Sequence, residues 1–386
     1  MKILIVRTVP GEIKYSLGTY NEQYIGLARA LIEKGHQCDI ICSSDDGKEK
    51  TRIIPVDNGK QIKLFCVKAT IIMKNAILHF DSAIFDDYDI IQAIEYNQIY
   101  TWYLAKKCKN KVIIYHGPYY SSFNKRYNFM AKCFDLIFLR RYIKNNTAFI
   151  TKSKLAEDYL RNKGITNVSS VGVGLDINSL EPTKEKALLS ELGKKMECSN
   201  ATYMMLYIGR IEPRRNSLFL IDMLKELRRR GENVYLTIVG EGPKEYVECF
   251  FAKVKENDLN NYILYEPKLE QKYLSEIYGN ADIFLLPTNY DIYGMVLLES
   301  MYYGLPTISS PCGGAQMMIQ NWDNGVVIDG YDVCIWCDAI LKILLERNVA
   351  DKMGCQAHKE IIQEFTWERI GEIILQYYKC VLETNQ

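Results

Sequence analysis

Short apolar runs of strand length alternate along the first half of the chain with segments whose apolar residues have helical spacing. Helical spacing is clearest over residues 18–34 and 98–107. The runs that predict strands are 2–7, 37–42, 62–67, 90–93, 111–115 and 148–151. Strands that alternate with helices predict a parallel sheet with helices on both faces.

The same alternation starts again in the second half of the chain. A helix is predicted over residues 218–230, and strands are predicted over 203–208, 234–239, 262–265, 283–286, 307–309 and 326–327. The pattern therefore predicts an α/β protein with two Rossmann-like, doubly wound parallel-sheet domains, residues 1–182 and 183–365. Two such sheets facing each other would form a cleft, and ligands would bind where strands end.

Composition limits the class of protein. The 386 residues are 48% hydrophobic and 25% charged, the ordinary mixture of a soluble globular protein. No run approaches the roughly 18 apolar residues of a membrane-spanning helix. The four apolar residues before Arg7 are fewer than a signal peptide needs. We therefore expect a cytoplasmic protein.

Charge is unevenly distributed. Residues 1–182 hold 26 Lys and Arg against 18 Asp and Glu, whereas residues 183–386 hold 22 against 29. Six cations lie between Lys125 and Lys144, opposed only by Asp135 and interleaved with aromatic and aliphatic residues. The segment resembles a helix that lies on an anionic membrane, although a packed helix with a solvated basic face has the same pattern. We expect no nucleic-acid partner.

Neither of two metal-like patterns predicts a metal site. Cys334, Cys337, Cys355 and His358 have zinc-ligand spacing, but the first pair falls in an apolar helical stripe where cysteine behaves as a small hydrophobe. The sequence Asp87-Tyr88-Asp89 imitates a metal-binding D-x-D motif, but it directly precedes a predicted strand and lacks the structural setting of that motif.

Three loops that follow predicted strands of the second domain carry residues suited to a phosphorylated ligand. The first, Gly209-Arg210-Ile-Glu-Pro-Arg214-Arg215-Asn216, offers guanidinium groups that can grip a diphosphate. The second contains Gly240, where backbone can approach a ligand closely. The third runs from Asp291 through Tyr293 and Gly294 into a helix with Glu299 one turn along, so the N–H groups of Gly294, Met295 and Val296 would face an anion.

These motifs resemble those of the retaining glycosyltransferases of family 4, which have the two-domain GT-B fold. The signature E-x-[F/Y]-G-x4-E followed by A-x-G-x-P-V is similar to Asp291-Ile-Tyr-Gly-Met-Val-Leu-Leu-Glu299 and the following segment up to Pro306. The family's diphosphate clamp resembles the loop from Gly209 to Asn216. Its N-terminal glycine-rich loop, T-x-H-G and N-G-V-D motifs resemble residues 16–19, 115–117 and 173–176. The resemblance runs nearly from end to end.

The resemblance implies a function and a role for each site residue. It implies transfer of a hexosyl group from a nucleotide-diphosphate sugar, most often a UDP-sugar, to a sugar or lipid-linked glycan of a bacterial surface polysaccharide or glycoconjugate, without metal or other cofactor. Residues 183–365 would bind the donor, residues 1–182 the acceptor, and a helix over about 366–386 would pack back on the first domain. The implied catalytic residues are His116, Asp291, Arg210, Arg215 and Glu299. The implied donor-binding residues are Gly18, Gly209, Arg210, Arg215, Gly240, Lys268, Asp291, Tyr293, Gly294, Met295, Val296 and Glu299.

Departures from the family pattern leave alternatives. Asp291 replaces a glutamate, Arg215 a lysine and Gln316 an acid, and only Gly18 remains of the glycine-rich loop. A catalytically degenerate nucleotide-sugar-binding protein or an epimerase of the same fold is the alternative. Phosphorylases need a pyridoxal-bearing lysine and usually a longer chain. Periplasmic-type binding modules lack an arginine-rich clamp, and nicotinamide oxidoreductases would carry G-x-G-x-x-G after the first strand.

Overall fold

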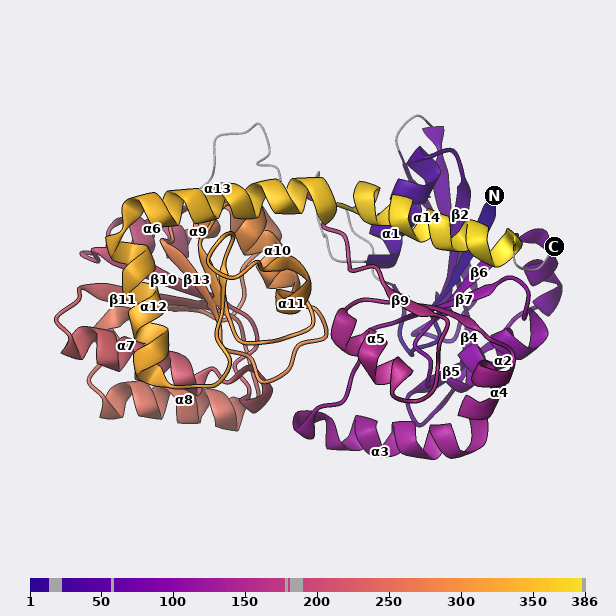
Figure 1. Ribbon diagram of the computed structural model, residues 1–386, viewed down its shortest axis with the longest axis horizontal. Helices are drawn as coiled ribbons and strands as arrows, with labels where there is room; N and C mark the ends of the chain where they lie inside the picture. Colours follow the sequence, from indigo (N-terminus) through magenta and orange to yellow (C-terminus); the bar gives the residue numbers. More distant parts are fainter. Residues whose placement is uncertain (14–22, 57–58, 178–179, 181–189, 384–386) are drawn as a thin grey trace. The chain divides into compact units, whose positions relative to one another are not determined.

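The computed structural model describes residues 1–13, 23–56, 59–177, 180 and 190–383 (Figure 1). The chain divides into two compact units, Met1–Asp176 with Thr366–Gln386, and Ile177–Phe365. The first division falls six residues before the predicted position at 182/183, and the second coincides with the predicted one.

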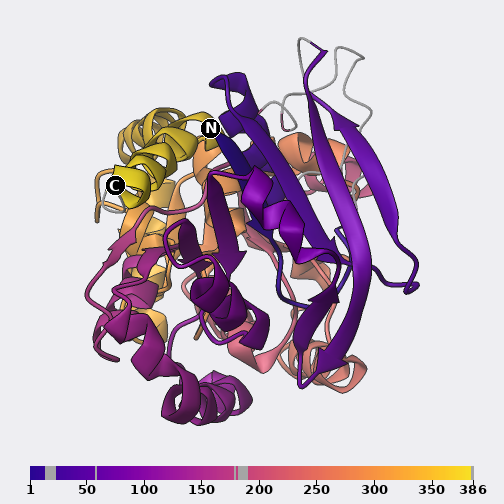
Figure 2. The same cartoon turned by 90° about the vertical axis from the view of Figure 1, so that its right-hand side faces the viewer.

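Unit 1 is built on a largely parallel sheet with strand order β3-β4-β2-β1-β6-β7-β8-β9. β3 pairs antiparallel with β4 at one edge, and β5 pairs antiparallel with the far end of β4, the long violet strand of Figure 2. The strands are β1 (Lys2–Val6), β2 (Gln37–Ser43), β3 (Lys50–Pro55), β4 (Gln61–Ile72), β5 (Asn75–His79), β6 (Ile90–Ile94), β7 (Val112–His116), β8 (Ala148–Thr151) and β9 (Val168–Ser170).

The helices of unit 1 include one from the C-terminal end of the chain. Gly26 on α1 lies against the indole of Trp367 on α14, where a side chain on the glycine would overlap the ring. This close approach packs α14 onto α1, as the resemblance implied. The helices are α1 (Gln23–Glu33), α2 (Ile99–Lys107), α3 (Lys125–Phe134), a π-helical stretch (Asp135–Leu139), α4 (Arg140–Lys144), α5 (Lys154–Arg161) and α14 (Trp367–Glu383).

Unit 2 has a fully parallel sheet in the order β12-β11-β10-β13-β14-β15. Its strands are β10 (Tyr203–Ile208), β11 (Val234–Val239), β12 (Ile263–Glu266), β13 (Ile283–Leu286), β14 (Thr307–Ser309) and β15 (Val326–Val327). Numbered from β10, this order is 3-2-1-4-5-6, and the chain changes direction across the sheet between β10 and β13. β13 is buried along its whole length, as expected for a central parallel strand.

Helices cover the sheet of unit 2, and α12 packs against α7 and α13 (Figure 1). The helices are α6 (Glu191–Glu197), α7 (Leu218–Arg229), α8 (Lys244–Glu256), α9 (Leu274–Gly279), α10 (Met295–Tyr302), α11 (Ala315–Met318), α12 (Val333–Leu345) and α13 (Arg347–Glu364). Among the helices of the described residues, none is both long and apolar enough to cross a membrane.

The predicted strands are confirmed, with bounds that differ by at most one residue except at β4. Three strands were missed. β3 is mostly exposed and β5 has only five residues, so neither has a strong apolar pattern. β9 has three residues with one buried. Of the helix predicted over residues 18–34, the structure describes the part from Gln23 onward.

Candidate functional site

The carboxyl edge of the unit 2 sheet brings two of the predicted loops together. β10 and β13 are neighbours at the point where the strand order reverses, with Met205 opposite Ile283 and Leu206 opposite Phe284. The loops after these strands leave the same edge on either side of that point. This is where open parallel sheets form ligand sites.

Two glycines let the loops after β10 and β11 pack backbone against backbone. A Cβ on Gly240, which has φ +145°, would overlap the carbonyl oxygen of Gly209. A Cβ on Gly242 would overlap the carbonyl oxygen of Ile211. The Gly209 N–H also donates to the Val239 carbonyl at 2.9 Å. Gly209 and Gly240, both predicted site residues, therefore set the course of the arginine-bearing loop.

Hydrogen bonds join the arginine loop to the loop after β13. The N–H of Asn289 donates to the carbonyl of Arg214 at 2.9 Å. The Arg214 guanidinium donates to the carbonyl of Tyr290 at 3.2 Å and to the carboxylate of Glu212 at 2.7 Å. Arg214, the middle arginine of the motif, is thus a structural link between the two loops.

Arg215 and Asp291 form an ion pair with each other at the centre of this edge. Both side chains are largely buried, and Nε of Arg215 has no hydrogen-bond partner among the described residues. Burial opposes the charge of Arg215, but the adjacent Asp291 carboxylate outweighs it and raises the pKa of the guanidinium. The sequence placed both residues on a ligand and did not predict that they contact each other.

Arg210 is more accessible than Arg215. Its side chain is 52% exposed, and its Nε lies 3.5 Å from Glu212, a distance that gives a weak surface pair. The guanidinium is therefore available to an anion at this edge. Arg210 and Arg215 place one exposed and one largely buried positive charge on the same loop.

The loop after β13 turns into α10 at Gly294, which has a left-handed φ of +83°. As a glycine, this N-cap residue makes no side-chain capping hydrogen bond. The first N–H groups of an α-helix, here those of Met295 and Val296, have no partner within the helix and carry partial positive charge. Tyr293, directly before the glycine, is buried, and Gly314 packs against its carbonyl oxygen. The arrangement leaves the helix end suited to an anion or a hydroxyl.

Glu299 lies on the second turn of α10 and is almost fully buried. Its Oε2 accepts a hydrogen bond from the hydroxyl of Tyr278 on α9 at 2.9 Å. Burial raises the pKa of Glu299 to about 8, because the surroundings offer little to stabilise the anion. A carboxyl with this pKa can donate or accept a hydrogen bond near neutral pH.

A second group of ionisable side chains lies at the carboxyl edge of the unit 1 sheet. His116 ends β7 and is fully buried. Its Nδ1 lies 2.6 Å from Oε2 of Glu95, the residue that follows β6. Lys152, which follows β8, is also buried, and its backbone N–H donates to the His116 carbonyl at 2.8 Å. The sequence analysis found His116 and missed Glu95 and Lys152, although each follows a predicted strand.

Two residues of the predicted set remain, Lys268 and Gly18. Lys268 is exposed in the loop after β12. Gly18 lies outside the described residues. Asp89 accepts a hydrogen bond from the Lys2 N–H at 2.7 Å, a structural role that suits the rejection of the D-x-D motif.

The zinc alternative finds no support in the described residues, where no group of three or more His, Cys, Asp or Glu side chains gathers that could hold a metal ion. The apolar interpretation of the first cysteine pair is correct for Cys337, which is buried. It is wrong for Cys334, which is exposed.

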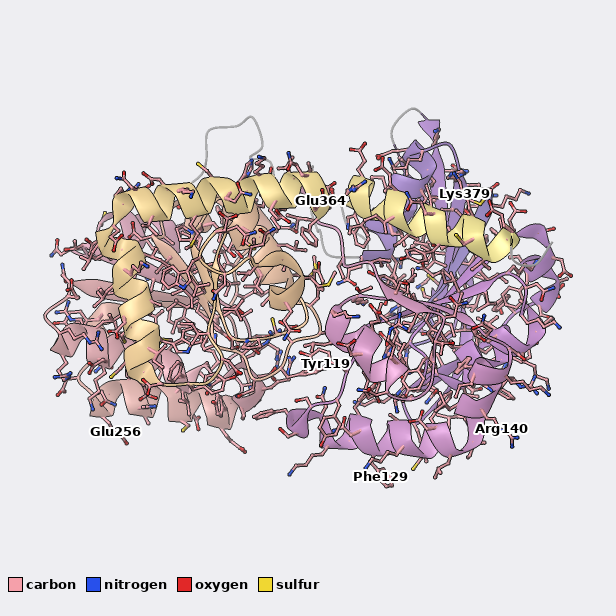
Figure 3. The ribbon with its side chains drawn as sticks, in the orientation of Figure 1. Tyr119, Phe129, Arg140, Glu256, Glu364 and Lys379 are labelled. Carbon is pink, nitrogen blue, oxygen red and sulfur yellow. The ribbon has the colours of Figure 1, made fainter. Side chains whose placement is uncertain are left out.

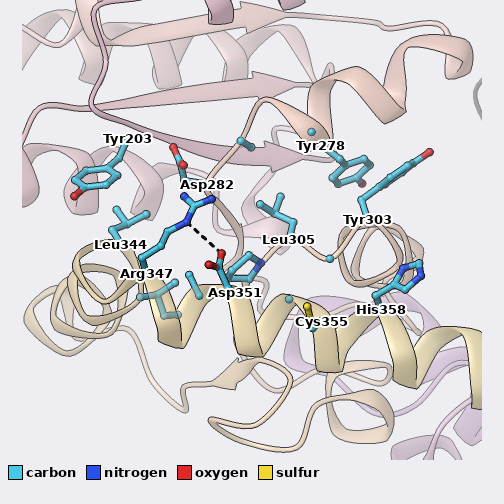
Figure 4. A pocket seen from close by; sticks show the side chains of 17 residues that line it. Tyr203, Tyr278, Asp282, Tyr303, Leu305, Leu344, Arg347, Asp351, Cys355 and His358 are labelled. Atoms are coloured by element: carbon cyan, nitrogen blue, oxygen red, sulfur yellow. Dashed lines mark ion pairs between the residues drawn. The ribbon is translucent and has the colours of Figure 1, made fainter. Parts of the chain in front are cut away.

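A pocket of about 700 Å³ lies at the opposite, amino-terminal edge of the unit 2 sheet (Figure 4). Tyr203 and Asp282 line it from the starts of β10 and β13, and Cys355 and His358 line it from α13. An ion pair between Arg347 and Asp351 spans part of its wall. The pocket also touches Tyr278, the partner of Glu299, but contains none of the predicted site residues.

Comparison with known proteins agrees with the resemblance stated above. A family model described as "Glycosyl transferases group 1" matches residues 193–360, and one described as "Glycosyltransferase Family 4" matches residues 23–178. Together the two models span most of both units.

Two curated relatives are glycosyltransferases by name, and their sequence identities to this chain are similar. A D-inositol 3-phosphate glycosyltransferase of Xylanimonas cellulosilytica is 24% identical over 58% of this chain and 54% of its own length. A GDP-mannose-dependent alpha-(1-6)-phosphatidylinositol monomannoside mannosyltransferase of Mycobacterium tuberculosis is 25% identical over 53% of this chain and 54% of its own length. The alignments thus span about half of each relative.

Among solved structures, HepE of Anabaena in complex with UDP and glucose has a TM-score of 0.72 at 14% identity, over 98% of this chain and 100% of that one. This likeness extends to both units and shows the fold. The chain belongs to the group 1 glycosyltransferases of family 4 and has the GT-B fold.

Proposed function

We propose that the protein is a retaining glycosyltransferase that moves a hexosyl group from a nucleotide-diphosphate sugar to a sugar or lipid-linked glycan acceptor. The observation that carries this proposal is the carboxyl edge of unit 2. There the exposed Arg210, the Arg215–Asp291 pair and the N-terminus of α10 meet at the strand-order reversal. A diphosphate is the ligand that such an edge suits.

Each residue at this edge has a role in the proposed reaction. Arg210 and Arg215 would neutralise the leaving diphosphate, which is why we propose that transfer needs neither a divalent metal nor another cofactor. Asp291, held by Arg215, would orient the transferred sugar together with the N–H groups after Gly294. Glu299 would bond the ribose hydroxyls, as the family resemblance implies.

We propose a UDP-sugar as the donor. A fold neighbour was solved with UDP and glucose, whereas the mycobacterial relative is named for GDP-mannose. Thermal unfolding of the protein with UDP, GDP, ADP and their common sugars, first without metal and then with EDTA, decides between them. We expect UDP ligands to raise the melting temperature most, with EDTA having no effect.

Arg210→Ala should remove that shift, and Arg347→Ala is the matched control, since Arg347 is a 79%-exposed arginine at the opposite edge of the same sheet. No shift with any nucleotide, or a shift that Arg210→Ala leaves intact, would contradict the proposed donor site.

A catalytically degenerate binding protein is the second candidate, and the ion pair between Arg215 and Asp291 favours it because each charge is already opposed by the other. Incubation with the nucleotide sugar that raises the melting temperature distinguishes the enzyme from the binding protein. Release of the nucleotide with a sugar acceptor present, and an unchanged anomeric configuration in the product by proton NMR, is expected of the retaining enzyme. Binding of the nucleotide sugar without release of the nucleotide, whichever sugar acceptor is added, is expected of the degenerate protein.

We also propose that unit 1 contacts an anionic membrane, which would bring the enzyme to a lipid-linked acceptor of a capsule or similar glycoconjugate at the inner face of the plasma membrane. The contact is the α3–α4 surface, defined as the outward side of the continuous helical segment from Lys125 to Lys144. Leu136 is 88% exposed, Ile137 72% and Phe129 65%. Phe129 and Arg140 lie on this segment at the outer edge of unit 1 (Figure 3).

The charge of the α3–α4 surface is positive throughout. All six of its cations are exposed, namely Lys125, Arg126, Lys132, Arg140, Arg141 and Lys144. Asp135, its one acid, is largely buried in an ion pair with Lys163. Exposed apolar side chains among unopposed cations are the composition of interfacial helices, and each cation near an anionic bilayer contributes about 1 kcal/mol.

Vesicle sedimentation tests this contact. We expect the protein to sediment with vesicles containing anionic lipid at low salt, and not with purely zwitterionic ones. Replacing Leu136 and Ile137 with serine should abolish sedimentation. Ile335→Ser, at an isoleucine 55% exposed on α12, is the control and should have no effect. Absence of binding to anionic vesicles would contradict the contact.

A further inference from the structure

Glu95, which lies between β6 and the turn at residues 96–97, has an unusual backbone conformation. Its φ is +61°, in the left-handed region that non-glycine residues seldom adopt. The Glu95 N–H donates to the Tyr115 carbonyl at 3.1 Å, which fixes the residue against β7. Strain of this kind persists where surrounding contacts hold it, and it concentrates at functional sites.

The conformation brings the Glu95 carboxylate to the end of β7. Oε2 lies 2.6 Å from Nδ1 of His116 and accepts the N–H of Gly117 at 3.3 Å. Burial opposes ionisation, but the neighbouring His116 and Lys152 outweigh it and lower the pKa of Glu95. An ionised carboxylate can only accept, so Nδ1 of His116 carries the proton.

The other ring nitrogen of His116 is left without a protein partner. Nε2 is buried and makes no hydrogen bond among the described residues. The rings of Tyr96, edge-on at 5.0 Å, and Tyr159, stacked at 6.1 Å, hold the imidazole in place. A buried nitrogen that is oriented and unpaired is unfavourable, and a hydrogen bond from a ligand hydroxyl would remove that cost.

Lys152 completes the surroundings of Glu95. Burial lowers the pKa of Lys152, while the charge of Glu95 acts in the opposite direction. Its Nζ donates to Oε1 of Gln23 at 3.0 Å, and its backbone N–H holds the carbonyl of His116. The carboxylate therefore contacts the histidine directly and feels the charge of the lysine.

We propose that Glu95 is a positioning residue: it holds the proton of His116 on Nδ1 and so makes Nε2 the acceptor of a hydrogen bond from a sugar hydroxyl. The proposal rests on the proposed function for the identity of that hydroxyl. The tautomer itself is a property of unit 1 and can be measured without turnover.

Nitrogen-15 NMR of histidine-labelled protein tests the tautomer directly, because the chain has only four histidines. His116→Asn assigns the signal. We expect Nδ1 to be protonated in the wild type and the Nε2-protonated form to gain population in Glu95→Ala. Glu157→Ala, which removes another buried carboxylate of unit 1, is the control and should leave the signal unchanged. A wild-type His116 protonated on Nε2, or a signal that Glu95→Ala does not move, would overturn the proposal.

Kinetics then separate this proposal from the proposed function. With an active donor and acceptor, Glu95→Ala should lower kcat about 100-fold with little change in the donor KM, and Glu95→Asp should recover part of the loss. An effect on KM alone would overturn the positioning role in transfer. If the NMR result holds while His116→Asn leaves transfer unchanged, it is the proposed role of His116 in the reaction that fails.

Discussion

The two sheet edges that carry the candidate residues arrange their ionisable groups in different ways. In unit 2, the arginines and Asp291 lie on loops that are joined by close glycine contacts and backbone hydrogen bonds. The N-cap residue of α10 is a glycine, which has no side chain to cap the helix. In unit 1, Glu95, His116 and Lys152 lie at the carboxyl ends of three consecutive strands, and the Glu95 carboxylate contacts the buried His116. The first arrangement suits a polyanionic ligand that brings its own charge. The second suits recognition of a neutral hydroxyl by one oriented nitrogen.

Breaking the ion pair of unit 2 should have the largest effect. Arg215→Ala leaves Asp291 without its partner in a mostly buried position, which costs about 3–5 kcal/mol and should abolish the nucleotide-induced thermal shift. Denaturant unfolding of Arg215→Ala, Asp291→Asn and the double variant measures the coupling. Additive effects of the two single variants would show that the pair is not a unit.

Disturbing the loop contact should have a smaller effect than breaking the ion pair. In Gly240→Ala the new Cβ overlaps the Gly209 carbonyl, so the arginine loop must move. We expect a loss of about 1–3 kcal/mol in unfolding free energy and at least tenfold weaker nucleotide binding by calorimetry. Gly279→Ala, where the added atom meets nothing, is the matched control. Equal affinity of both variants would contradict the role given to Gly240.

The buried carboxyl of Glu299 in unit 2 should make the unfolding free energy depend on pH. Its pKa is 4.5 in an unfolded chain and about 8 when folded, so between these values the folded state binds more protons. Stability should therefore fall as pH rises through this window, by up to on the order of 4 kcal/mol relative to Glu299→Gln. Denaturant unfolding of both proteins from pH 5 to 9 measures the difference, and parallel curves would contradict the raised pKa.

Arg210→Ala should have the smallest effect on stability and a clear effect on binding. The side chain is half exposed and pairs weakly, so unfolding should change by less than about 0.5 kcal/mol. Loss of one charged contact to a diphosphate should weaken binding by about 1.5–3 kcal/mol, again by calorimetry. A destabilised variant with unchanged affinity would show that Arg210 is structural.

The sequence predicted the site residues of the unit 2 edge more completely than those of the unit 1 edge. The fold and the unit 2 loops were predictable because buried parallel strands leave continuous apolar runs, and because glycine, arginine and acid cluster directly after them. Glu95 carries no such signal, since its importance comes from a left-handed backbone and a partner 21 residues away. The pairing of Arg215 with Asp291 joins residues 76 apart, which strand order alone brings together.

The most direct test of the account is hydrogen exchange of the amides with and without the nucleotide that gives the largest thermal shift. The account predicts slower exchange over residues 209–216 and 291–296, the two loops at the carboxyl edge of unit 2. Protection confined to the Tyr203 and Cys355 pocket at the opposite edge, or none in unit 2, would contradict it.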